Sequence, residues 1–122
     1  MRRALRLAAG LSLAAALALP AVAVGPEAEI DALIGALAGS GCEFRRNGTW
    51  HGAARAQAHL QRKYDWLRKR GLAGTPELFI ERAATRSSAS GRVYRVRCPG
   101  QPEASSAEWF GDRLRRLREA ES

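Results

Sequence analysis

The first 23 residues have the three-part layout of a secretory signal peptide, and they limit both the size and the environment of what remains. A basic start at residues 1–6, an apolar run at residues 7–19 and the small residues Ala21 and Ala23 follow one another in that order. We expect cleavage after Ala23 and a single small globular domain at residues 24–122, located in the periplasm. The apolar run of about 13 residues is shorter than the roughly 20 that cross a bilayer, so no transmembrane anchor is expected after cleavage.

Two cysteines, Cys42 and Cys98, are the only ones in the chain, and both follow the predicted cleavage site. An oxidising compartment favours pairing them, and they lack the CxxC spacing of a reactive thiol pair. We therefore expect one structural disulfide. With both thiols paired, only His51 and His59 remain as strong metal ligands, and the sequence contains no HExxH, haem-attachment or phosphate-loop motif. No metal site and no cofactor are predicted.

Apolar residues recur at helical spacing over residues 26–38, 53–70, 75–86 and 106–119, which predicts four helices. Asn47 and Gly48 favour a tight hairpin turn between two short extended pieces, and residues 92–98 alternate like a strand with Tyr94 and Val96 on one face. The disulfide would bring this strand beside the hairpin. The predicted fold class is α+β and mainly helical, with about four helices packed on a small two- to three-stranded sheet stapled by one disulfide.

The chain is basic, with 20 Lys and Arg against 12 Asp and Glu and a formal net charge of +8. Loss of the three arginines in residues 1–23 would leave about +5. An exported protein of this charge meets phosphates of lipids and lipopolysaccharide, and carboxylates of peptidoglycan. The expected partner is therefore an anionic component of the cell envelope or a periplasmic protein, and not nucleic acid. The alternative is that the charge only solvates the surface.

A candidate binding surface follows from two segments. His59 and Lys63 lie four residues apart and share one face of the predicted second helix, and a serine-rich turn precedes the predicted strand. Hydroxyls, backbone amides and guanidinium groups converging at this turn would bind phosphate or carboxylate. The candidate binding residues are Arg46, Asn47, His59, Lys63, Ser87, Ser88 and Ser90, with Arg45, Arg86 and Arg92 as further arginines that could converge there.

Each of these candidates also has a structural interpretation. His59 could fix packing through a hydrogen bond to a carbonyl or to the serine-rich turn, and the serines could simply cap and turn the chain. The three tryptophans, Trp50, Trp66 and Trp109, could offer flat faces to sugars or to a partner, but we expect them to close the core of so small a protein.

The sequence is compatible with three classes of function. We favour a binding or interaction module without catalysis, because no GxSxG or Ser-x-x-Lys motif occurs. One alternative is a small envelope hydrolase or transferase with His59 as general base and Ser88 as nucleophile, which requires the two side chains within about 3 Å. Another is a structural accessory of an envelope complex that docks through the helix at residues 106–119.

An ordered set of short motifs adds a family resemblance. The segments are Ser40-Gly41-Cys42-Glu43-Phe44-Arg45-Arg46-Asn47-Gly48, Ala58-His59-Leu60 with Lys63-Tyr64, Glu77 with Phe79-Ile80, and Ser87-Ser88-Ala89-Ser90-Gly91 with Tyr94, Val96 and Cys98. Together they resemble the YfeK-like family of small exported bacterial proteins, a domain of unknown function, over roughly residues 30–117. The resemblance implies a periplasmic protein and supplies no catalytic residues.

Overall fold

The computed structural model describes Gly10 and residues 24–121, so the predicted signal peptide lies outside the described residues except for Gly10. Within these residues, four helices and three of the four strands follow the predicted order. The elements are α1 (Pro26–Ala38), β1 (Glu43–Arg46), β2 (Thr49–Gly52), α2 (Ala53–Arg68), α3 (Pro76–Ala83), β3 (Arg95–Arg97), β4 (Ala104–Ser105) and α4 (Ser106–Glu121). The prediction of a mainly helical α+β fold is confirmed.

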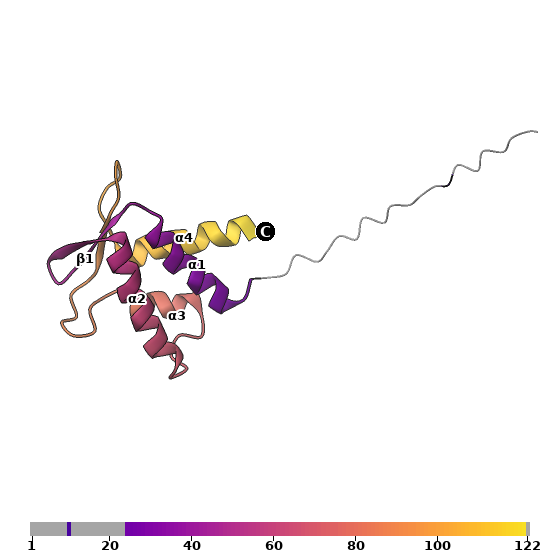
Figure 1. The fold of residues 1–122 in the computed structure, drawn as a ribbon, viewed down its shortest axis with the longest axis horizontal. Coiled ribbons are helices and arrows are strands. Elements are labelled where there is room, and N and C mark those ends of the chain that lie inside the picture. Colours follow the sequence, from indigo (N-terminus) through magenta and orange to yellow (C-terminus); the bar gives the residue numbers. More distant parts are fainter. Residues whose placement is uncertain (1–9, 11–23, 122) are drawn as a thin grey trace, which may run out of the picture.

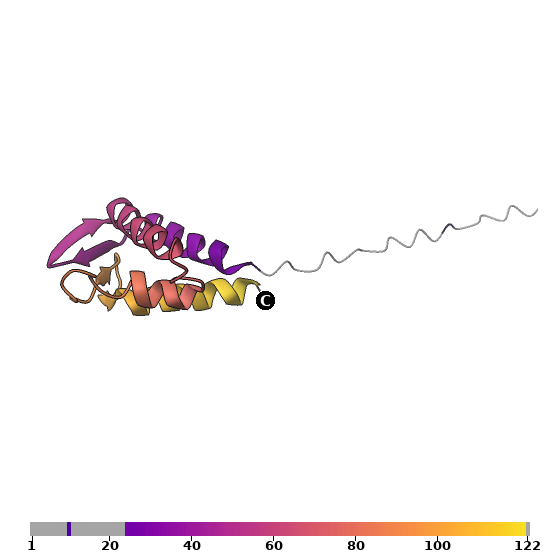
Figure 2. The same ribbon diagram turned by 90° about the horizontal axis from the view of Figure 1, so that it is seen from below.

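The strands form one antiparallel sheet in the order β2-β1-β3-β4, at one end of the molecule (Figure 1). Beyond the sheet, α1 and α2 make one layer and α3 and α4 a second layer (Figure 2). The start of α1 and the end of α4 lie together at the end away from the sheet (Figures 1 and 2). Within its layer α2 has one side that carries the exposed Trp66.

The sheet has four strands, one more than the upper number of the two to three predicted. Ala104 and Ser105 pair with Val96 and Arg95 of β3. Two residues are too few to produce an alternating pattern, so only the tertiary pairing reveals them as a strand. Two helices are also shorter than predicted: α2 ends at Arg68 and α3 at Ala83.

The core is built from the predicted apolar stripes. Leu33 and Leu37 of α1, Leu60 of α2 and Leu114 of α4 are all buried. Aromatic rings join the layers, since the Phe79 ring centre of α3 lies 5.7 Å from that of Tyr64 and 6.0 Å from that of Phe110. Thr75 caps α3 as predicted: its hydroxyl oxygen accepts a hydrogen bond from the Leu78 amide at 3.2 Å.

The predicted hairpin turn is present between β1 and β2. Asn47 has φ +50° and Gly48 has φ +82°, the left-handed conformations that an Asn-Gly turn provides. The turn sets the register in which Arg46 pairs with Thr49. Arg46 is therefore held at the end of β1 closest to the serine-rich turn that precedes β3.

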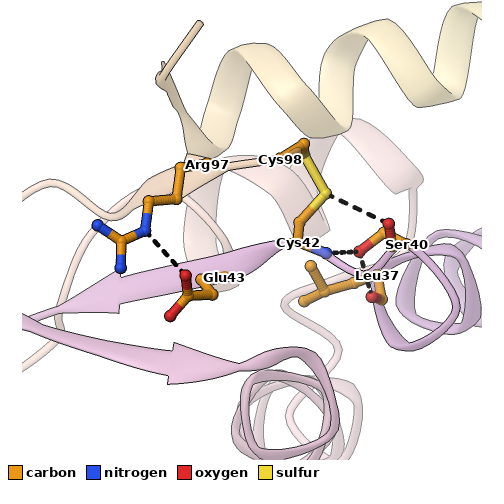
Figure 3. The surroundings of a disulfide bond; sticks show 6 residues. All are labelled: Leu37, Ser40, Cys42, Glu43, Arg97 and Cys98. Atoms are coloured by element: carbon orange, nitrogen blue, oxygen red, sulfur yellow. Dashed lines mark hydrogen bonds and ion pairs between the residues drawn. A yellow bond between two sulfur atoms is a disulfide. The ribbon is translucent and has the colours of Figure 1, made fainter. Parts of the chain in front are cut away.

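The predicted disulfide joins Cys42 to Cys98 (Figure 3). It lies next to the paired residues Glu43 of β1 and Arg97 of β3, whose side chains form an ion pair at 3.0 Å across the two strands. On the other side, the Ser40 hydroxyl accepts a hydrogen bond from the Cys42 amide at 3.0 Å and donates one to the Leu37 carbonyl at 2.6 Å. The disulfide thus links the segment between α1 and β1 to the end of β3.

The prediction that the tryptophans close the core is wrong for Trp66, whose side of α2 carries no covering element and leaves the residue 54% exposed. Trp109 does pack against the core, with its ring centre 4.9 Å from that of Phe110. Trp50 is half-buried on the sheet, where the Arg97 guanidinium lies 4.1 Å from its ring centre. Within the described residues, no helix has the length and apolar character of a membrane span.

Candidate functional site

His59 lies at the centre of a hydrogen-bonded chain between the hairpin and β3. Arg46 Nη1 is 2.8 Å from His59 Nδ1, and His59 Nε2 is 3.0 Å from the Tyr94 hydroxyl oxygen. Because a guanidinium can only donate, Nδ1 is the acceptor and the neutral ring carries its proton on Nε2. That proton is donated to Tyr94. Both ring nitrogens of His59 are therefore occupied.

The pKa of His59 is lowered to about 4, first by partial burial and then by the positive charges of Arg46, Lys63 and Arg62. Each of these effects disfavours the imidazolium form. His59 is therefore neutral at pH 7, which agrees with the hydrogen bond that its Nδ1 accepts from Arg46.

Lys63 joins the same chain from the next turn of α2. Its ammonium donates to the Tyr94 hydroxyl at 3.2 Å and to the Arg86 carbonyl at 3.0 Å. Burial, and next the charge of Arg46, lower the pKa of Lys63 below its usual value. The Arg86 residue predicted to converge on the site thus contributes its carbonyl oxygen to the ammonium.

Tyr94 is the central residue that the sequence pattern did not identify as functional. Its ring is buried and packs on Phe44 at 4.8 Å between ring centres, as predicted for the inward face of the strand. Burial raises the pKa of its hydroxyl, so the group stays protonated at neutral pH. The hydroxyl oxygen accepts from His59 and Lys63 together, and no pattern of apolar alternation predicts such a role.

Most of the serine-rich turn has structural hydrogen bonds. Ser87 is buried, and its hydroxyl oxygen accepts from the amides of Ala89 at 3.3 Å and Ser90 at 3.2 Å. The Ser90 hydroxyl donates to the Asn47 side-chain oxygen at 2.6 Å, which ties the turn to the hairpin. Ser88, in contrast, lines a pocket.

That pocket, called the main pocket below, has a volume of about 380 Å³ and lies between α2, α3 and the serine-rich turn. Its lining residues are His59, Arg62, Lys63, Trp66, Leu67, Arg82 and Ser88. Three of them carry positive charge and none carries negative charge. Of the candidate residues, His59, Lys63 and Ser88 meet here, whereas Arg46 contacts the pocket only through His59.

Arg62, Trp66, Leu67 and Arg82 were not predicted as site residues. The three-residue spacing between His59 and Arg62 is a signal that could have placed Arg62 on the same face of α2. Arg82 belongs to α3 and reaches the pocket only through helix packing. Arg45 lies elsewhere, 5.9 Å from the ring centre of Trp50. Arg92 lies against the hairpin at Gly48.

The geometry gives no support to His59 as a base for Ser88. Both residues line the main pocket, but the ring nitrogens of His59 are bonded to Arg46 and Tyr94. With a pKa of about 4, the imidazole is also a weak base. Within the described residues, no group of three or more His, Cys, Asp or Glu side chains is arranged to hold a metal ion.

Comparison with known proteins adds one finding. Residues 24–118 match the model of a family described as "Family of unknown function (DUF5329)". The chain belongs to this family. No curated protein and no solved structure matches it. The DUF5329 match includes both pocket-lining helices, the serine-rich turn and the disulfide.

Proposed function

We propose that this DUF5329 protein is an exported binding protein without catalysis, and that its main pocket takes an anionic ligand of the cell envelope. The observation that carries the proposal is the lining of the pocket by Arg62, Lys63 and Arg82 without a carboxylate. Guanidinium and ammonium donors in a partly enclosed site bind phosphate or carboxylate through charge-assisted hydrogen bonds. The Ser88 hydroxyl adds a neutral donor at the edge.

The state of the cations also supports binding. Within the described part of the chain, Arg62, Lys63 and Arg82 form no ion pair with a carboxylate, although eight ion pairs occur elsewhere. Lys63 is held in place by two hydrogen bonds, so its ammonium is oriented before a ligand arrives. A site arranged in advance loses less entropy when it binds.

Export is part of the same proposal. The signal-peptide pattern, the resemblance to the YfeK-like family and a family match that starts at residue 24 all favour it. Mass spectrometry of the protein recovered from a periplasmic extract should show a chain that starts at Val24. A chain that keeps residues 1–23 and stays in the cytoplasm would contradict export.

Calorimetric titration tests the pocket. We expect saturable binding of glucose 6-phosphate and none of glucose, because the anionic group provides the main contacts. Arg82→Gln should weaken binding about tenfold, the effect of losing one charge-assisted hydrogen bond. Arg115→Gln is the matched control, since Arg115 is exposed on α4 and outside this pocket. No binding of the phosphate, or equal losses in both variants, would refute the proposal.

A further inference from the structure

A second, smaller hollow adjoins the main pocket. This side pocket has a volume of about 110 Å³ and is lined by Phe44, Arg46, His51, Arg55, Ala56, His59 and Arg62. His59 and Arg62 line both pockets, so the two hollows lie on either side of these side chains. The side pocket likewise has no carboxylate in its lining.

Residues that line the two pockets lie on one face of α2, so the pockets form one elongated surface along the helix. Arg55, His59, Arg62 and Trp66 are separated by four, three and four residues and so share one face of the helix. Arg55, Arg62 and Trp66 are exposed and His59 is half-buried. Arg55 and Arg62 are seven residues apart, which corresponds to about 10 Å along the helix axis.

Five cations line this surface: Arg46, Arg55, Arg62, Lys63 and Arg82. None of them forms an ion pair within the part of the chain that the structure describes. Like charges on neighbouring turns of one helix repel one another. A ligand with one acidic group in each pocket would relieve the repulsion in both places, whereas a single anion relieves it in one.

The main pocket also has an apolar side made of Trp66 and Leu67. Trp66 is 54% exposed, and the Arg70 guanidinium lies 3.8 Å from its ring centre. This guanidinium covers one face of the indole, so a sugar ring would place its C–H face against the other, because the π face is electron-rich. Acidic groups about 10 Å apart match acidic groups on alternate sugars of a glycan, whereas a duplex strand carries a phosphate about every 3.4 Å.

We infer that the two pockets together bind an acidic oligosaccharide lying along α2, with one acidic group in each pocket and a sugar ring against Trp66. This inference rests on the proposed function and extends it from a single anion to a chain. Arg62, which lines both pockets, would contact both acidic groups or the sugar between them.

Affinity as a function of chain length tests the inference. The probes are glucuronic acid and a hyaluronan tetrasaccharide, which carries carboxylates on alternate sugars. We expect the tetrasaccharide to bind about a hundredfold more tightly than the monosaccharide, because the second acidic group binds intramolecularly. Arg55→Gln should abolish most of this gain, whereas Arg82→Gln should weaken the binding of both ligands.

The outcomes separate the inference from the proposed function. Equal affinity for the two ligands, with glucose 6-phosphate still bound, would overturn the inference and leave the proposed function intact. An equal chain-length gain in Arg55→Gln would overturn the role of the side pocket. Tighter binding of a single-stranded oligonucleotide than of the tetrasaccharide would overturn the assignment to a glycan. If glucose 6-phosphate also fails to bind, the proposed function falls with it.

Discussion

The lowered pKa of His59 leads to the most specific prediction, made with the variant Arg46→Gln. Glutamine can still donate a hydrogen bond to Nδ1, so the substitution removes the charge and keeps the contact. The pKa of His59 is about 4 in the unchanged protein, and burial is the largest cause. Removing the second largest cause should raise this pKa, and the remaining burial should keep it below 6.5.

The same shift makes stability depend on pH. The unfolded chain binds a proton on His59 near pH 6.5, while the folded chain binds it only near pH 4. Between these values the unfolded state holds more protons, so stability is full above pH 6.5 and falls as the pH drops toward 4. A shift of this size corresponds to about 3 kcal/mol when fully expressed. Because water reaches part of the ring and screens it, we expect a loss of about 1 kcal/mol.

Histidine NMR measures the pKa of His59, and urea unfolding at several pH values measures the loss of stability. The chain has only His51 and His59, so two ring signals are expected, and a His51→Asn variant assigns them. The pKa of His51 is also lowered, first by partial burial and then by the charge of Arg46. The pKa of His51 should therefore rise in Arg46→Gln as well. A His59 pKa near 6.5 in the unchanged protein would refute the hydrogen-bonded chain. A His59 pKa that is the same in Arg46→Gln as in the unchanged protein would also refute it.

Three further predictions concern stability and are measured by urea unfolding at pH 7. Replacing Cys42 and Cys98 with alanine opens a loop with a sequence separation of 56. It should cost about 4 kcal/mol, and a loss below about 1 kcal/mol would contradict the structural role. Tyr94→Phe removes a hydroxyl that accepts two hydrogen bonds and should cost about 2 kcal/mol. An unchanged midpoint would show that those bonds do not form. Gly48→Ala places a side chain at φ +82° and should cost about 1 kcal/mol, whereas Gly74→Ala, whose φ is not positive, should have little effect.

The local parts of the fold could be predicted from the sequence because their causes are local. Apolar spacing predicted α1, Thr75 predicted the start of α3, and Asn47-Gly48 predicted the turn. The disulfide followed from having only two cysteines. In contrast, β4 exists only because β3 lies beside it, and two residues carry no pattern of their own.

The candidate site was predicted in part for the same reason. His59 and Lys63 share a helix face, which their spacing alone determines. Arg82 lies near His59 and Lys63 only because α3 packs beside α2. The Tyr94 hydroxyl reaches the same two side chains only because β3 pairs with β1. Ser87, Ser90 and Asn47 looked like ligand-binding groups, yet they bond to the turn and the hairpin. Residue type alone does not distinguish a hydroxyl that binds a ligand from one that shapes a loop.

The most direct test of the proposal that the main pocket binds an anion is an NMR titration of the protein with glucose 6-phosphate. The three tryptophans provide separate indole signals in the main pocket (Trp66), on the sheet (Trp50) and against the core (Trp109). A saturable shift of the Trp66 indole, with the Ser88 amide moving alongside it and the other two indoles unchanged, is the result that we predict. Saturable shifts centred on Trp50, or no shift at all, would contradict the account.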